Sequence, residues 1–210
     1  MVWAMPLVTL SASYGAGGSE VGPALARRLD VPFVDRAVPS SVARELAGTV
    51  DGGVFWRLLR NVSPVASWTA AGIHQPPALD ARLADRADTE AALRALMADG
   101  RGVILGRAGA LALRDDPRAL HVRLDGPLEA RVVQAMRIEG VDEATGRRRL
   151  KETDGARERY VRDLYGVDPT DPALYALVLD GTILDLECCV QTIAAAALAH
   201  AAAAGAGTPA

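Results

Sequence analysis

The strongest constraint on the fold is a glycine-rich turn that separates an apolar segment from a helical one. Leu7 to Leu10 is short, apolar and partly β-branched, which predicts a strand, and the residues 15–18, Gly-Ala-Gly-Gly, end it. From Ser19 onward apolar residues recur at helical spacing, and Ser19 is placed to cap that helix. A glycine turn between a strand and a helix directs backbone N–H groups to the positive end of the helix, where an anion can bind. The alternative is a tight turn that binds nothing.

Apolar runs and helical patterns alternate along the rest of the chain. Further strands are expected at Val31 to Asp35, Val103 to Leu105, Leu120 to Leu124 and Ala176 to Leu179. Helices are expected at 38–46, 79–98, 127–138, 142–164 and 186–203, whereas 48–77 is irregular. Continuous apolar strands separated by helices indicate an α/β fold, a parallel sheet covered by helices on both faces. Ligands of such sheets bind beyond the carboxyl ends of the strands. The site is therefore expected in the loops after Leu10, Val34, Leu105 and Leu124.

Length and charge indicate one domain with a local anion site. The 210 residues are expected to form a single domain over 1–203, followed by a flexible tail of small residues over 204–210. The formal net charge of −3 comes from interleaved acidic and basic residues, so neither nucleic acid nor a membrane is expected as a partner. No apolar run is expected to reach the ~20 residues of a membrane span, and the first residues lack the basic start of a signal peptide. A cytoplasmic location is expected.

The two cysteines, Cys188 and Cys189, are neighbours in the sequence. They cannot form a disulfide framework, and their spacing to the three histidines is not that of a metal site. They are expected to be small apolar residues on the final helix. No residue is therefore indicated as a protein ligand of a metal.

Five segments in a fixed order give the chain a resemblance to the cytidylate-kinase-like proteins, relatives of the nucleoside monophosphate kinases. The resemblance starts with VTLSASYGAGGSEVGPALARRLDVPFVDRA, continues through VILGRAGA and HVRLDGPLEARV, and ends with ETDGARERYVRDLYGVDPTDPALYALVLDGT. It implies a P-loop NTPase-type fold with an acceptor-side helical region at about 48–98 and a helical lid at about 140–165. It also implies ATP with Mg²⁺ as the donor, and CMP or a similar small acceptor.

The resemblance assigns roles to residues in three groups. The donor phosphates are expected on Gly15, Ala16, Gly17, Gly18 and Ser19. The acceptor is expected on Asp35, Arg36 and Arg107, since an arginine at the carboxyl end of a strand can hold a phosphate bidentately. The catalytic groups are expected to be Arg131, Asp154, Arg157 and Arg159, which could close over the transferred phosphoryl group. The arginine run 147–149 is interpreted instead as a solvated helix face with i,i+4 pairs.

The chain departs from the usual phosphate loop at the position where a lysine normally stands. Gly18 occupies that position, and the chain's single lysine is Lys151, in the expected lid. Ala12 and Ser13 stand where the family often has arginine and glutamate, and Ser19 stands where it often has arginine, which removes two cationic contacts to phosphate. Three readings therefore stay open: a slow kinase for CMP or a similar nucleotide, a nucleotide-binding or regulatory module without activity, and a kinase for a non-nucleotide acceptor.

Overall fold

The protein is described by a computed structural model, which describes residues 5–35, 87, 90, 91, 93–106 and 108–206. Its centre is a five-stranded sheet in the order β2-β3-β1-β4-β5, in which every neighbouring pair is parallel. The strands are β1 (Leu7–Ala12), β2 (Phe33–Val34), β3 (Gly102–Leu105), β4 (Ala119–Asp125) and β5 (Leu177–Asp180). Since all strands run in one direction, the loops that follow them lie at one edge of the sheet. This confirms the predicted α/β fold, and it is the edge at which the site is predicted.

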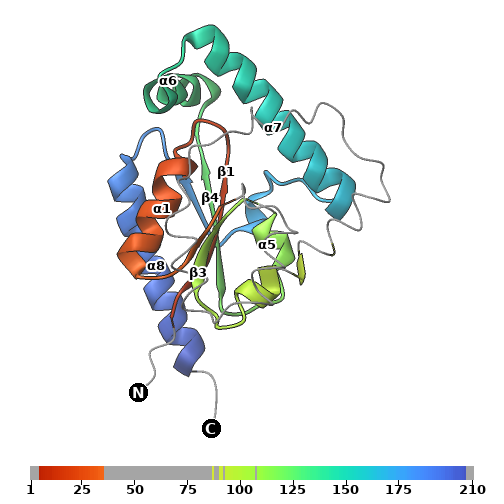
Figure 1. The fold of residues 1–210 in the computed structure, drawn as a ribbon, viewed down its shortest axis with the longest axis vertical. Helices are drawn as coiled ribbons and strands as arrows, with labels where there is room; N and C mark the ends of the chain where they lie inside the picture. Colours follow the sequence, from red (N-terminus) through yellow and green to blue (C-terminus); the bar gives the residue numbers. More distant parts are fainter. Residues whose placement is uncertain (1–4, 36–86, 88–89, 92, 107, 207–210) are drawn as a thin grey trace.

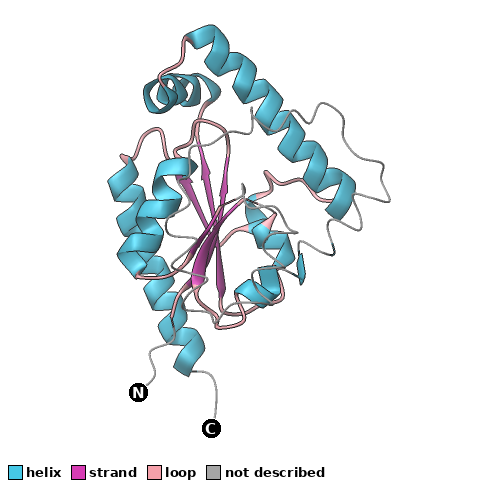
Figure 2. Ribbon diagram, in the orientation of Figure 1, coloured by secondary structure: helices cyan, strands magenta, loops and turns pink. Residues whose placement is uncertain are grey.

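Helices cover both faces of the sheet, as Figures 1 and 2 show. The helices with described bounds are α1 (Gly18–Leu29), α5 (Gly109–Ala112), α6 (Leu128–Glu139), α7 (Glu143–Tyr165) and α8 (Leu186–Ala206), and a 3-10 turn covers Pro172–Leu174. In Figure 1, α1 and α8 lie side by side on one face, and α5 lies on the other. The α6–α7 pair stands beyond the carboxyl edge of the strands, above the loop that follows β1. We call α7 the lid helix.

Alternation along β1 divides the core between the two faces. Val8 and Leu10 point to the side of α1 and α8, where they join Leu25 and Ile193 in one buried cluster. Leu7 points to the other side, where a second cluster also contains Ile104 and Met97. All of these side chains are at most 1% exposed. Burial of this kind stabilises by about 1.5–3 kcal/mol per large side chain, so β1 is held in place from both faces and its loop starts from a rigid support.

The ends of some elements differ from the sequence-based prediction. The cap of α1 is Gly17, in the left-handed region at φ 87°, and Ser19 lies inside the helix, so the predicted cap is wrong. Pro127 caps α6 instead of opening its first turn. At the carboxyl end of the chain, α8 continues to Ala206, beyond the predicted end at Ala203. The predicted helix at 38–46 and the irregular segment 48–77 lie outside the described residues.

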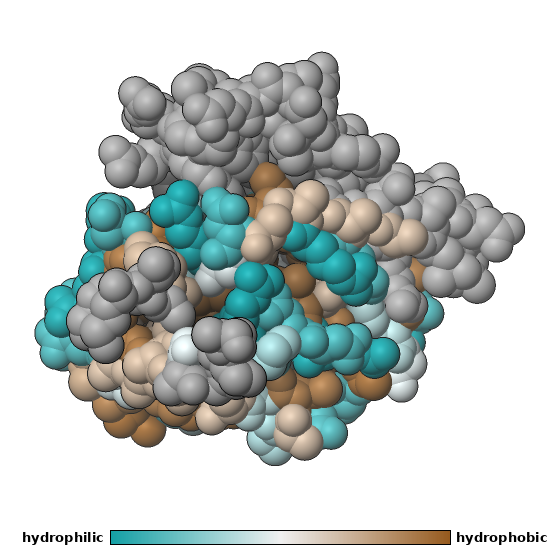
Figure 3. All heavy atoms as spheres, turned by 90° about the horizontal axis from the view of Figure 1, so that it is seen from below, coloured by the Kyte–Doolittle hydropathy of each residue, from teal (hydrophilic) through white to brown (hydrophobic). Residues whose placement is uncertain are grey.

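The expectation that no apolar run reaches the length of a membrane span is wrong for the final helix. Leu186–Gly205 is long and apolar enough to cross a membrane by length and composition alone. Core helices pass the same test, and one face of α8 belongs to the core: Cys189, Ile193 and Ala197 are at most 1% exposed and pack in the α1 side of the sheet. The cysteines lie on this helix as predicted. Figure 3, viewed from the end where α8 finishes, shows hydrophilic and hydrophobic residues alternating over the visible described surface.

Candidate phosphate site and lid

Residues 13–19, which contain the glycine-rich turn, form a compact loop from the end of β1 into the first turn of α1. We call these residues the phosphate loop. It is closed by a hydrogen bond from the Ala16 N–H to the Ser13 carbonyl (3.1 Å), while the Ser13 N–H donates to Leu124 of β4 (3.1 Å). Gly15 and Gly17 both have positive φ, 78° and 87°. A Cβ on Gly15 would lie 2.1 Å from the carbonyl oxygen of Arg131, so no larger residue fits there.

Four backbone N–H groups of the loop, those of Gly15, Gly17, Gly18 and Ser19, have no hydrogen-bond acceptor among the described residues. Three of these groups belong to the cap and first turn of α1, where the helix presents its positive end. Converging donors of this kind are the usual backbone site for a phosphate group. The predicted donor-site residues 15–19 are therefore brought together.

The absence of the lysine has a local steric cause. A Cβ on Gly18 would lie 2.5 Å from the Cβ of Ala12. Any side chain at this position would therefore have to displace the end of β1, and a lysine there would do so too. Ala12 and Gly18 form a matched pair, and the loop's charge has to come from other elements.

Arg131 of α6 supplies a cation beside the loop. Its Nε donates to the Gly126 carbonyl (2.9 Å), and its Nη1 donates to the Tyr14 carbonyl (3.0 Å) and to Oδ2 of Asp154 (2.6 Å). The side chain is 11% exposed, so these contacts are only weakly screened by solvent. The predicted catalytic residues Arg131 and Asp154 are thus in direct contact.

The lid helix reaches the loop through two side chains. Oδ1 of Asp154 accepts the Tyr14 N–H (2.8 Å), and Nη1 of Arg157 donates to the carbonyl of Ala12 (2.7 Å). The same Arg157 nitrogen lies 3.9 Å from Oδ1 of Asp154. The loop, α6 and Arg157 enclose a cavity of about 30 Å³, comparable with the volume of one water molecule in the liquid. In this arrangement a lid carboxylate is bound to the loop.

A larger hollow of about 430 Å³ lies elsewhere, between α5 and the start of β4. Its lining includes Arg94, Asp116 and Arg118. Asp116 and Arg118 lie just before the amino end of β4, at the opposite edge of the sheet from the glycine loop. Arg118 is bound there by Asp116 and by the carbonyl of Ala98. The small cavity at the loop, not this hollow, therefore marks the candidate site.

Arg123 is a buried charge at the site that the sequence-based analysis missed. On β4 it is 6% exposed, and it donates to Asp125 (2.8 Å), to Oγ of Ser13 (2.9 Å) and to the Pro169 carbonyl (3.1 Å). Burial opposes charging of both groups, but their mutual hydrogen bonds prevail, so the pKa of Asp125 is lowered and the pKa of Arg123 is raised. The signal for it was an arginine inside an apolar strand, His-Val-Arg-Leu-Asp.

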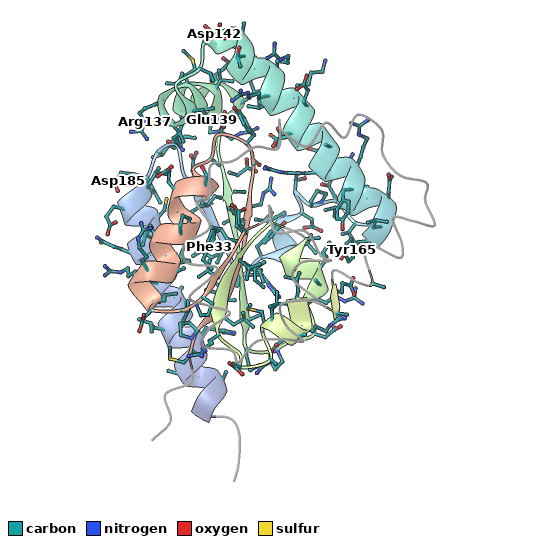
Figure 4. All side chains as sticks on the ribbon, in the orientation of Figure 1. Phe33, Arg137, Glu139, Asp142, Tyr165 and Asp185 are labelled. Atoms are coloured by element: carbon teal, nitrogen blue, oxygen red, sulfur yellow. The ribbon has the colours of Figure 1, made fainter. Side chains whose placement is uncertain are left out.

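Tyr14 connects the loop to both upper helices. Its hydroxyl donates to Oε2 of Glu139 (2.7 Å), the last residue of α6, which Figure 4 labels above the loop. Burial and the Glu139 hydrogen bond raise the pKa of Tyr14 to about 12. Glu139 also pairs with Arg149, and Arg147 pairs with Glu129 and Glu143, the last at i,i+4. Of these pairs, the one between Glu143 and Arg147 has the predicted i,i+4 spacing. The other two differ from the prediction, because they join α7 to α6.

Two described residues of the expected lid, Arg159 and Lys151, are not gathered at the loop. Arg159 is exposed, and its Nε donates to the carbonyl of Gly155 on its own helix (3.1 Å). Lys151 is likewise exposed on α7. Asp35 directly follows β2, at the site edge of the sheet. The predicted acceptor residues Arg36 and Arg107 lie outside the described residues, so their roles stay predictions.

The fold and the loop define a class of protein. Five parallel strands in this order, with a glycine loop between the central strand and the first helix, form a P-loop kinase-type fold with a helical lid. A solved structure shares this fold: an uncharacterized protein from Eubacterium ventriosum has a TM-score of 0.65 at 18% identity, covering 90% of this chain and 95% of that chain. A shikimate kinase from Acinetobacter baumannii in complex with shikimate has a TM-score of 0.47 at 15% identity, covering 94% of this chain and 95% of that chain.

The chain belongs to the cytidylate kinase-like family, whose model matches residues 7–183. It is also similar to a cytidylate kinase from Methanopyrus kandleri, with 37% identity over 99 residues. The match covers 46% of this chain and 51% of the relative, so the chain spans about half the length of the curated relative that it matches. The family assignment confirms the resemblance noted in the sequence.

Proposed function

We propose that this protein is a phosphotransferase that moves the γ-phosphoryl group of ATP to CMP or a similar small acceptor. The observation that carries the proposal is the set of loop N–H groups at Gly15, Gly17, Gly18 and Ser19, which have no acceptor among the described residues. Membership of a kinase-like family supports the same reaction class. We propose the cytoplasm as its location, where ATP is available.

In the proposed mechanism the loop positions the donor and the arginines neutralise charge. The unpaired N–H groups would hold the donor phosphates, and Arg131 and Arg157 would face the oxygens on which charge accumulates. Asp154 would orient Arg131 through their 2.6 Å contact. Asp35, Arg36 and Arg107 would hold the acceptor, with Arg159 at the periphery.

Magnesium fits the donor groups of this site without a dedicated protein cage. No group of three or more His, Cys, Asp or Glu side chains in the described part of the chain is arranged to hold a metal ion. Mg²⁺ in phosphoryl-transfer sites is usually bound by substrate phosphates, water and one or two protein oxygens. The Ser19 hydroxyl, in the exposed first turn of α1, would be such an oxygen. The ion would neutralise charge on the transferred group.

We expect the reaction to be slow. Losing one preorganised charge-stabilising donor commonly costs about a hundred- to a thousandfold in turnover, and Gly18 offers no replacement for the lysine. An arginine from the lid could recover part of that loss, because it supplies the same charge from another direction. Arg157 is the residue best placed for this, since it is already bonded to the end of β1.

One observation favours a second candidate, a nucleotide-binding module without chemistry. The close fit between Ala12 and Gly18 leaves no space for a lysine, so the charge deficit is part of the packing. Such a module would bind nucleotides through the loop but transfer no phosphoryl group. A kinase for a non-nucleotide acceptor is the third candidate, based on the divergent segment 48–77 of the sequence.

The test is ATP turnover with CMP, dCMP and UMP, together with ATP binding measured by calorimetry. Slow turnover that drops at least tenfold in Arg157→Ala supports the proposal. The matched control is Arg162→Ala on the same helix, where the guanidinium pairs with Asp168 instead of reaching the loop. Efficient turnover unchanged by Arg157→Ala would show that the charge comes from elsewhere. ATP binding without turnover on any of the acceptors would favour the binding module, whereas ATP hydrolysis or transfer to another small alcohol would favour the third candidate.

A further inference from the structure

Gln134 of α6 is a buried amide with two carbonyl partners on different loops. The residue is 9% exposed, and its Nε2 donates to the carbonyl of Gly15 (3.0 Å) and to the carbonyl of Gly181 (2.9 Å). Gly181 lies in the turn between β5 and α8, whereas Gly15 is in the phosphate loop. Because both partners are carbonyl oxygens, only the NH₂ end of the amide can face them. One side chain therefore joins two loops that are far apart in the sequence.

The orientation of the loop's peptide groups depends on this contact and its neighbour. Arg131, one turn earlier on α6, binds the Tyr14 carbonyl, so two consecutive carbonyls of the loop are held from outside. In a trans peptide the C=O and the following N–H point in opposite directions. Holding the Tyr14 carbonyl outward therefore directs the Gly15 N–H away from α6. Holding the Gly15 carbonyl fixes the peptide whose N–H closes the loop onto Ser13.

The two loops are closely packed around the amide. A Cβ on Gly181 would lie 2.3 Å from the Ala16 carbonyl oxygen, and a Cβ on Gly17 would lie 3.2 Å from Nε2 of Gln134. The same Gly17 Cβ would be 2.4 Å from Leu186, at the start of α8. The loops are thus in direct contact, and Gln134 satisfies the two carbonyls that the contact buries. A displacement of about 1 Å at such a site can cost a hundredfold in rate.

We propose that Gln134 is a positioning residue, which sets the phosphate loop against the β5–α8 turn so that the loop N–H groups converge on the donor phosphates. The inference rests on the proposed function of the loop. Gln134 carries no charge and donates both contacts to protein carbonyls, so it acts through the loop and not on the phosphate itself. Arg131 differs, because its positive charge would also attract the ligand directly.

The test compares Gln134→Met, which keeps length but donates nothing, with Gln134→Glu, which keeps shape but loses the donor when ionised. We expect Gln134→Met to weaken ATP binding about tenfold, the effect of one lost hydrogen bond. The salt dependence of binding should stay that of the wild type, because no charge is removed. For Gln134→Glu we expect weaker binding at pH 8 and partial recovery near pH 5, where a protonated buried carboxyl can donate to one carbonyl. The wild type and Gln134→Met, measured at the same pH values, give the baseline.

The control is Gln191→Met on α8, whose amide binds Glu187 on the exposed side of its helix and touches neither loop. It should bind ATP like the wild type. Wild-type ATP affinity in Gln134→Met would overturn the inference and leave the proposed function intact, whereas a wild type that does not bind ATP would overturn both. If Gln134→Met fails to fold, Gln134→Asn decides, since its shorter amide cannot span both carbonyls. Unchanged affinity in that variant would overturn the inference, and about tenfold weaker binding would support it.

Discussion

Replacing Asp154 by asparagine should tighten the binding of ATP while slowing its turnover. The carboxylate binds the Tyr14 N–H at 2.8 Å and Arg131 at 2.6 Å, with the Asp154 side chain 17% exposed. A phosphate bound to the N–H groups of Gly15, Gly17, Gly18 and Ser19 would compete with this carboxylate for the guanidinium of Arg131. The lid's own charge is therefore a competitor for the ligand.

The expected gain follows from the contact between Asp154 and Arg131. A hydrogen bond to a charged group contributes about 1.5–3 kcal/mol, compared with about 1 kcal/mol for a neutral one. Asparagine keeps the shape and the acceptor oxygen but loses the charge, so displacing it costs about 1–2 kcal/mol less. That difference corresponds to roughly a five- to thirtyfold gain in ATP affinity. Turnover should fall because Arg131 loses the carboxylate that orients it.

Calorimetric titration with ATP and with pyrophosphate checks the affinity, and a coupled assay checks the turnover. Glu152→Gln is the matched control, since it removes one negative charge from the exposed surface of the same helix. If this control tightens binding as much as Asp154→Asn, the effect is long-range electrostatics. Weaker ATP binding in Asp154→Asn would refute the reasoning, because it would mean that the carboxylate supports the bound ligand instead of competing with it.

Two further predictions concern the loop and the sheet. Gly15→Ala should abolish ATP binding, because the new Cβ would lie 2.1 Å from the Arg131 carbonyl oxygen at a positive φ; unchanged calorimetric titration would show that the loop is only a turn. His121 binds Thr9 at 2.8 Å, and burial, with a smaller effect of His200, lowers its pKa. Its contribution to stability is therefore complete above the unfolded pKa of about 6.5 and declines as the pH falls through that value toward the folded pKa. Urea unfolding of His121→Asn should lose less stability than the wild type between pH 7 and pH 5, and an equal loss in both would contradict this.

The strands and the glycine loop could be predicted from the sequence because their signals are local. Each strand is a short apolar run, and a glycine-rich turn between a strand and a helix is a strong local signal. The contact between Arg131 and Asp154 could not be predicted, since it joins two helices whose crossing depends on tertiary packing. The Ser19 cap failed because Gly17, in a left-handed conformation, starts the helix earlier. Arg123 was missed because periodicity identifies apolar residues and does not predict which buried charge finds a partner.

The position of the chain's single lysine has a practical consequence. Lys151 is exposed on the lid helix, three residues before Asp154, and the phosphate loop contains no amine at all. An amine-reactive fluorophore would therefore modify a side chain on the lid helix alone, besides the terminal amine, and leave the loop untouched. Lys151 is therefore an attachment point for a fluorophore that follows the lid helix in solution while ATP is titrated.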